Sequence, residues 1–87
     1  MKTQTLEILT PEKMAVKTVN AEFITIPGYS GELGILPGHM EVIALLSPGE
    51  VRVTAGGETE KYIIAAGFAE VSKETVRVFT TLAKRKT

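Results

Sequence analysis

The chain has 87 residues, of which ten are basic and ten acidic, with one histidine and no cysteine. This length fits one domain, residues 1–87, and the lack of cysteine excludes a disulfide framework or a thiolate metal site. The balanced charge creates no field that would attract DNA or RNA, and no apolar run approaches the length of a membrane span. Nucleic-acid binding is therefore not expected, and any membrane association would need a partner protein.

Apolar and polar residues alternate along most of the chain, which indicates strands rather than helices. The expected strands, separated by turns with Pro, Gly, Asn or Ser, lie near residues 5–9, 13–17, 22–26, 40–46, 50–54, 62–71 and 75–79. Residues 55–58 (Ala-Gly-Gly-Glu) give the clearest hairpin signal, and Gly67 predicts a bulge or a close backbone approach. Many short strands without a helix predict an all-β sandwich or barrel.

Residues 26–38 contain four glycines and two prolines, which rules out a helix there. We expect a turn, a short apolar segment and a second turn, with Glu32 and His39 at the corners. Glu32 could be a solvated turn carboxylate, a general acid, or a docking group for a basic loop of a partner. The glycine spacing does not make a phosphate loop, because no Lys-Ser/Thr and no helix follow it.

Catalytic and metal-binding chemistry has little support in the sequence. His39 is the only histidine, and no acidic residues stand at metal-ligand spacing around it. Nothing combines a nucleophile, a base and oxyanion donors. We therefore expect no catalytic residue, no metal site and no cofactor, and His39 is better explained as a polar surface or interface residue.

Two predicted strands are apolar on both faces, at residues 40–46 and 62–69. Phe23 and Phe79 add to this surplus, since both fall on the polar phase of their strands. A two-layer sandwich of this size cannot cover both faces of two such strands. Some apolar surface should therefore remain exposed, which predicts a protein partner.

Residues 31–39 read Gly-Glu-Leu-Gly-Ile-Leu-Pro-Gly-His, residues 46–53 Leu-Ser-Pro-Gly-Glu-Val-Arg-Val, and residues 66–71 Ala-Gly-Phe-Ala-Glu-Val. In order and spacing, these segments resemble the epsilon subunits of the rotary proton-translocating ATP synthase. The first turn, residues 9–13, and the closing strand, residues 76–78, also resemble the family. The likeness covers almost the whole chain.

This resemblance implies a flattened two-sheet β-sandwich of about ten short strands. It implies a non-catalytic subunit of the central stalk, the rotor, that binds the gamma subunit and the c-ring and couples proton flow to ATP synthesis. The subunit would lie at the cytoplasmic face of the bacterial inner membrane and touch the membrane only through the complex. By motif match, Ser30, Gly31 and Glu32 would face the basic, polar loops of the c-ring, and the residues facing gamma would be Thr10, His39, Val42 and Ala44.

The chain departs from the family at two points. Family members usually read Pro-Gly-His-Ala-Pro-Leu, whereas His39 is followed here by Met-Glu-Val. Most members also continue beyond the position of Thr87 as a helical hairpin that can inhibit ATP hydrolysis. We expect either a trimmed chain or a short form that lacks this hairpin, so neither inhibition nor ATP binding by it is assigned to these residues.

The alternative function is a stand-alone β-sandwich module that binds a ligand, such as a carbohydrate, or a protein. A ligand-binding module would need a concave pocket lined by aromatic side chains. The sequence offers two tyrosines, three phenylalanines and no tryptophan. Stable association with gamma would distinguish the two functions.

Overall fold

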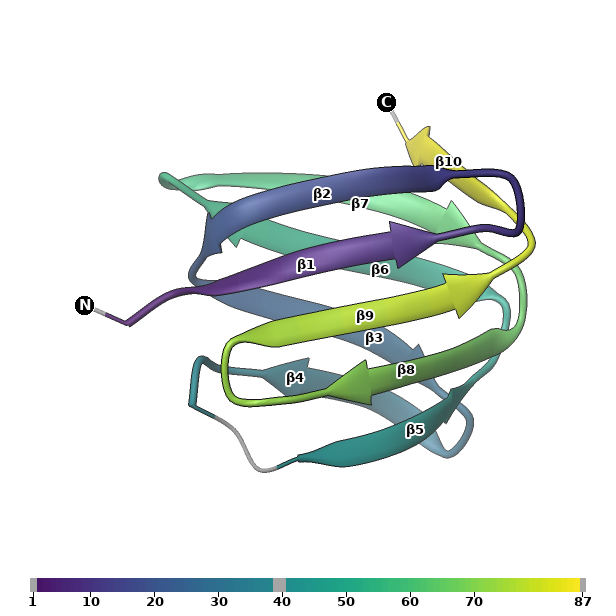
Figure 1. Cartoon of the computed structure of the whole chain (residues 1–87), viewed down its shortest axis with the longest axis horizontal. Coiled ribbons are helices and arrows are strands. Elements are labelled where there is room, and N and C mark those ends of the chain that lie inside the picture. Colours follow the sequence, from purple (N-terminus) through teal and green to yellow (C-terminus); the bar gives the residue numbers. More distant parts are fainter. Residues whose placement is uncertain (1, 39–40, 87) are drawn as a thin grey trace.

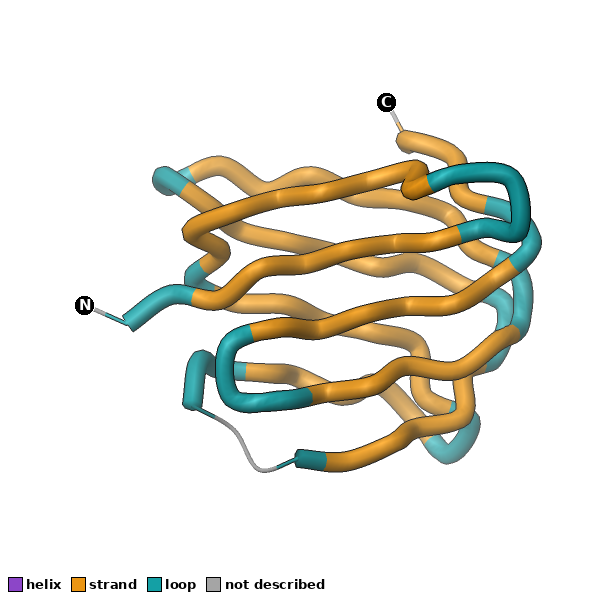
Figure 2. The backbone as a smooth tube through the Cα atoms, viewed as in Figure 1, coloured by secondary structure: helices purple, strands orange, loops and turns teal. Residues whose placement is uncertain are grey.

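The computed structural model describes residues 2–38 and 41–86, and these residues form strands, turns and loops without any helix (Figure 2). Accordingly, no described segment is a helix that could span a membrane. The strands are β1 (Gln4–Leu9), β2 (Met14–Ala21), β3 (Phe23–Gly28), β4 (Gly31–Ile35), β5 (Val42–Leu46), β6 (Gly49–Ala55), β7 (Glu58–Ile64), β8 (Gly67–Val71), β9 (Thr75–Thr80) and β10 (Ala83–Lys86).

The strands form one sheet that folds over on itself, in the order β10-β7-β6-β3-β5-β8-β9-β1-β2, with β4 paired to β3 beside this path. In Figure 1, β2, β1, β9, β8 and β5 form a front layer, and β3, β4, β6 and β7 lie behind them. β10 extends this back layer beyond β7. The layers connect through Gly28 opposite Leu46, and β2 lies against β6 on the other side. The all-β fold and the predicted flattened two-sheet sandwich are confirmed.

The core lies between the two layers and follows the alternation of the sequence. Leu6 and Ile8 of β1 are fully buried, as are Val76 and Val78 of the parallel neighbour β9. Burial of each such aliphatic side chain contributes about 1.5–3 kcal/mol. The other buried apolar residues are Ala21, Ile24, Ile26, Ile35, Leu46, Val51, Val53, Tyr62, Ile64, Ala69 and Val71.

The turn chemistry agrees with the sequence in two places. Gly56 and Gly57 both have positive φ, +61° and +80°, in the hairpin between β6 and β7. Gly67 is a site of close backbone approach, because an added Cβ would overlap the carbonyl group of Phe79 on β9.

Residues 62–71 are not one strand, as the alternation had suggested. β7 ends at Ile64 in the back layer and β8 begins at Gly67 in the front layer. The chain crosses between the layers at residues 65–66, which changes the phase that points inward. Tyr62 and Ile64 are buried before the crossing, whereas Ala69 and Val71 are buried after it and Phe68 is exposed.

The basic residues near the end of the described chain belong to a paired strand. Residues 83–86 form β10, which pairs antiparallel with β7. Arg85 Nη2 lies 2.9 Å from Glu60 Oε2, and the Tyr62 hydroxyl donates to Glu60 Oε1 at 2.8 Å. Burial, together with the hydrogen bond to Glu60, raises the pKa of Tyr62 above its ordinary value.

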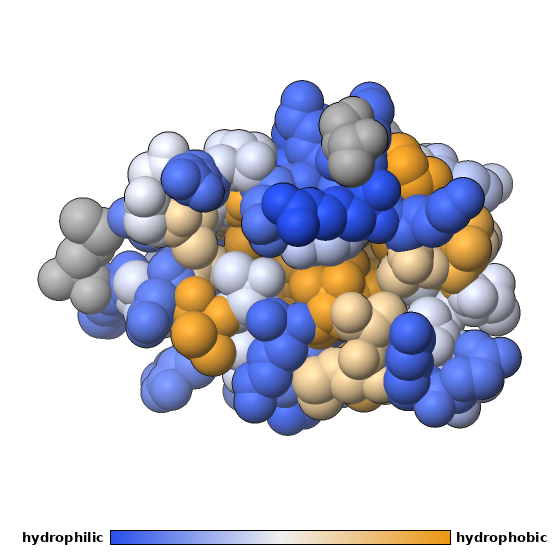
Figure 3. All heavy atoms as spheres, turned by 90° about the horizontal axis from the view of Figure 1, so that it is seen from above, coloured by the Kyte–Doolittle hydropathy of each residue, from blue (hydrophilic) through white to orange (hydrophobic). Residues whose placement is uncertain are grey.

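Seen from above, hydrophilic side chains gather at the centre of the side where β2, β7 and β10 lie, with apolar ones showing between them (Figure 3).

Candidate partner-binding surfaces

The turn between β3 and β4 is tightly determined by its glycines. Gly28 and Gly31 face each other across the turn formed by Tyr29 and Ser30. Gly31 has φ +135°, and an added Cβ at Gly28 would lie 2.5 Å from the Gly31 carbonyl oxygen. Side chains at either position would strain this turn. The predicted first turn is thus confirmed, and the apolar segment after it is strand β4.

Glu32 lies on β4 directly after this turn and is half exposed, with 54% of its side chain accessible. Its carboxylate is not simply solvated, since Oε1 lies 2.9 Å from Arg52 Nη2 on β6. The Arg52 guanidinium also contacts Glu50 at 3.3 Å. The hydrogen bond to Glu32, followed by that to Glu50, raises the pKa of Arg52 above its ordinary value.

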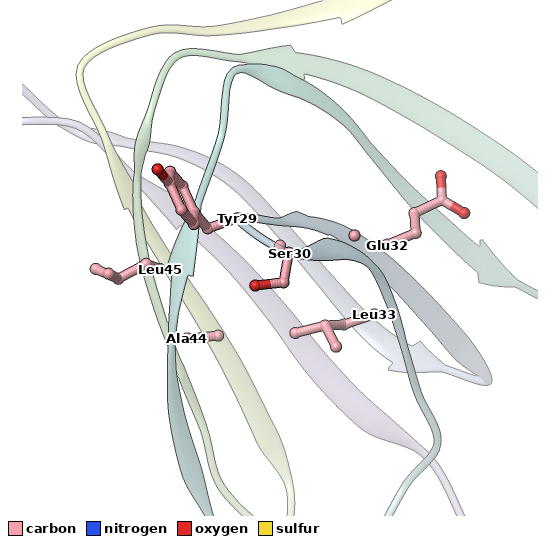
Figure 4. A pocket seen from close by; sticks show the side chains of 8 residues that line it. Tyr29, Ser30, Glu32, Leu33, Ala44 and Leu45 are labelled. Carbon is pink, nitrogen blue, oxygen red and sulfur yellow. The ribbon is translucent and has the colours of Figure 1, made fainter.

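A shallow hollow lies where this turn meets β5, to which the Tyr29 amide donates at the Leu45 carbonyl at 2.8 Å. Its volume is about 420 Å³, and its lining includes Ser30, Leu33 and Ala44. Leu33 and Ala44 point toward each other across the hollow, whereas Glu32 and Leu45 point away from it (Figure 4). Tyr29, Glu32 and Leu45 also belong to the lining, which thus combines apolar groups with two hydroxyls and one carboxylate.

The two faces of β5 differ in exposure. Val42 and Ala44 belong to the inward phase with buried Leu46, and Ala44 packs against the core. Val42 nevertheless exposes 46% of its surface at the start of the strand. On the outer face, Ile43 and Leu45 expose 70% and 68%.

An apolar row crosses the outer face of the front layer: Leu45, Phe68, Phe79 and Leu9 are direct neighbours on β5, β8, β9 and β1. The rings of Phe68 and Phe79 stack with centroids 4.8 Å apart. This row confirms the predicted exposure of apolar surface. On one side of the row, the neighbouring positions on β8, β9 and β1 are Glu70, Arg77 and Glu7, and Arg77 is held by Glu7 at 2.8 Å.

Thr10 lies beside this apolar row. Its amide donates to the Lys13 carbonyl at 2.9 Å, and its hydroxyl donates to the same carbonyl at 3.2 Å. The turn thereby places Thr10 on the wall of a groove of about 450 Å³ that also includes Leu9, Phe68 and Phe79. Thr10, Val42 and Ala44 all belong to the front layer, and His39 lies outside the described residues.

Sequence reasoning missed Arg52 and Leu45. Arg52 stands two residues after Glu50, so the alternation of β6 was a usable sign that the two share a face. The outward position of Leu45 had no such sign, because both phases of β5 are apolar. Among the described residues, no group of three or more His, Cys, Asp or Glu side chains could hold a metal ion.

Comparisons with known proteins agree on one family. The family model for the beta-sandwich domain of the ATP synthase delta/epsilon chain matches residues 3–86. The chain is 49% identical to an ATP synthase epsilon chain of Koribacter versatilis, covering 91% of this chain and 55% of that protein. It is 40% identical to the epsilon chain of Elusimicrobium minutum, covering 95% and 62%. The chain thus spans about three fifths of the length of these relatives.

Solved structures show the same architecture. A chain in the Euglena gracilis mitochondrial ATP synthase structure, which contains OSCP, F1 and the c-ring, aligns with a TM-score of 0.88 at 30% identity, over 95% of this chain and 53% of that one. A chain in the central stalk and c-ring structure from Tetrahymena thermophila aligns with a TM-score of 0.74 at 14% identity, over 94% and 66%. The second likeness supports the fold alone.

Proposed function

Because the chain belongs to the family of ATP synthase delta/epsilon chains, we propose that it is a non-catalytic subunit of the central stalk, the rotor, of a proton-translocating rotary ATP synthase. In this role residues 1–87 are its β-sandwich domain, which binds the gamma subunit and the c-ring and helps to couple proton flow to ATP synthesis. It acts at the cytoplasmic face of a bacterial inner membrane and associates with the membrane only through the complex. The family match over residues 3–86 is the observation that carries this proposal.

We place the gamma-binding surface on the front layer. Thr10, His39, Val42 and Ala44 are the family-matched positions, and the three described ones lie on this layer. The apolar row runs between Thr10 and β5, with charged neighbours such as Arg77 beside it. An apolar centre with a polar rim is the usual composition of a protein–protein interface.

We place the c-ring contact at the turn between β3 and β4. Ser30, Gly31 and Glu32 are all exposed there. This turn closes the β3–β4 hairpin beside β5, where the Tyr29 amide donates to the Leu45 carbonyl at 2.8 Å, so the two proposed contacts adjoin each other. The Glu32 carboxylate is the group that a basic loop would contact.

The gamma surface is tested by charge insertion. Leu45→Asp and Val42→Asp should weaken binding to purified gamma by about 30-fold or more, because a buried unpaired charge costs about 2 kcal/mol or more in an interface centre. Ile63→Asp is the matched control, since Ile63 is an exposed apolar residue on β7 in the other layer. The affinity for gamma is measured by calorimetry. If both variants keep the wild-type affinity, this placement of the gamma-binding surface is contradicted.

The c-ring contact is tested by charge reversal. Glu32→Lys should lower ATP-driven proton pumping of the reconstituted complex while the circular dichroism spectrum stays that of a β-sandwich, since the residue is half exposed. Glu58→Lys, at the exposed β6–β7 hairpin, is the control. If Glu32→Lys unfolds the chain, the residue is structural, and if pumping is unaffected the contact lies elsewhere.

A further inference from the structure

Four charged side chains connect the β3–β4 turn to the last strand across the outer face of the back layer. Arg52 on β6 contacts Glu32 on β4 at 2.9 Å and Glu50 at 3.3 Å. Glu50 in turn accepts from Lys86 Nζ on β10 at 3.0 Å. We call the series Glu32, Arg52, Glu50 and Lys86 the charge chain.

The two inner members of the charge chain are each shared between two partners. Arg52 divides its guanidinium between two carboxylates, and Glu50 divides its carboxylate between two cations. The inner side chains are 33% and 21% exposed, whereas Glu32 and Lys86 at the ends are 54% and 52% exposed. Loss of a contact at Glu32 or Lys86 can therefore alter the other contacts of the charge chain. An inner group that loses one partner is free to strengthen its contact with the other.

Other contacts limit how far such a change can reach. β10 remains paired with β7 through its backbone, and Arg85 holds Glu60 at 2.9 Å on the opposite face of the strand. Lys61 on β7, which is opposite Arg52, also attracts the Glu50 carboxylate. A weaker Lys86–Glu50 contact would thus loosen β10 without detaching it.

We propose that Arg52 is a positioning residue that competes with the basic partner loop for Glu32 and transmits binding at the β3–β4 turn to β10. This inference rests on the proposed function, in which that loop belongs to the c-ring. When a cation of the loop pairs with the Glu32 carboxylate, the Arg52 guanidinium loses this partner and pairs with Glu50 alone. Glu50 then holds Lys86 less tightly, and β10 separates from β7 more often.

The free chain tests this transmission without any partner. Glu32→Gln leaves Arg52 with Glu50 alone, so amide exchange of β10 should become about two- to five-fold faster, the range for an exposed ion pair. Arg52→Gln removes the same Glu32–Arg52 contact, but it also leaves Lys86 as the remaining partner of Glu50 in the charge chain. Amide exchange of β10 should therefore become slower by a similar factor. A purely structural contact would move both variants in the same direction.

Hydrogen exchange measured by mass spectrometry on β10 decides between these outcomes. Lys86→Gln should speed β10 exchange as Glu32→Gln does, whereas Lys84→Gln, an exposed lysine of the same strand, is the matched control and should not. Because the contacts are half exposed, 0.5 M NaCl should reduce every difference. Equal or same-direction changes in Glu32→Gln and Arg52→Gln would overturn the proposal.

A second experiment measures binding of the chain to purified c-ring in detergent. Arg52→Gln should bind it about two- to five-fold more tightly than the wild-type chain, because the competing guanidinium is gone. If the wild-type chain binds the c-ring and the Arg52→Gln chain binds it equally well or more weakly, the proposed competition for Glu32 is refuted. If no c-ring binding is found while the exchange changes keep their opposite signs, the charge chain stands and the proposed partner is wrong.

Discussion

Gly67 offers a sharp test of the packing between β8 and β9. An added Cβ would overlap the Phe79 carbonyl oxygen and lie 3.0 Å from the Phe79 carbonyl carbon and 3.2 Å from Thr80 Cα. All of these are backbone atoms of the neighbouring strand, so no side-chain rotation relieves the overlap. Gly67→Ala must therefore push the two strands apart where Gly67 faces Thr80.

The cost of Gly67→Ala has two parts and one offset. Overpacking costs about 1–3 kcal/mol. Moving the strand also stretches the contacts of the Thr80 hydroxyl with the carbonyls of Ala65 and Ala66, now 3.0 and 3.2 Å, at about 0.5–1.5 kcal/mol. Alanine also lowers the conformational entropy of the unfolded chain, which stabilises the folded state by about 0.4–1 kcal/mol. Together these terms lower the free energy of unfolding by about 0.5–4 kcal/mol, and the central value near 2 kcal/mol lowers Tm by about 8–16 °C in a domain of this size.

Gly34→Ala is the control for this experiment. Its Cβ would meet only the ring of Phe23, at 2.9 Å from Cζ, and because Phe23 is 41% exposed its side chain can turn aside. Thermal and urea unfolding followed by circular dichroism should place this variant within about 1 kcal/mol of the wild type. A Gly67→Ala chain as stable as Gly34→Ala would show that the strands are not this close.

Two further predictions concern the core and the charge chain. Ile8→Ala should lower the free energy of unfolding by about 2–5 kcal/mol in urea titration, because Ile8 is fully buried between the layers; a loss below 1 kcal/mol would mean that the layers collapse onto the cavity. The Lys86 ammonium, followed by Arg52, holds the pKa of the Glu50 carboxyl below its ordinary value against the opposing effect of desolvation. The stability from this depressed pKa is present above the pKa of the unfolded state, about 4.3, and is lost as pH falls through the folded-state pKa. The stability difference between wild type and Glu50→Gln should therefore be largest near neutral pH, shrink as pH falls through the unfolded-state pKa, and disappear once pH is below the depressed folded-state pKa; a difference that persists at still lower pH would contradict this account.

The position of each functional group was only partly predictable. Alternation identified the buried phase of β1 and β9 correctly, because one face of each is apolar and the other polar. It failed on β5, where Leu45 turned out to be the exposed residue and Ala44 the half-buried one. Where both phases are apolar, the side that faces the core depends on which strands pair with β5.

The local pattern of residues alone determined most of the strands, the glycine turns and the family, because period-two alternation and positive φ are properties of short segments. Tertiary pairing decided the rest: the crossing at residues 65–66, the apolar row from β5 to β1, and the pairing of Glu32 with Arg52. Alternation assigns a side chain to a face of its own strand but carries no information about the neighbouring strand or its register. Both surfaces proposed for partners are built from side chains on several strands, so they exist only once the sheet has formed.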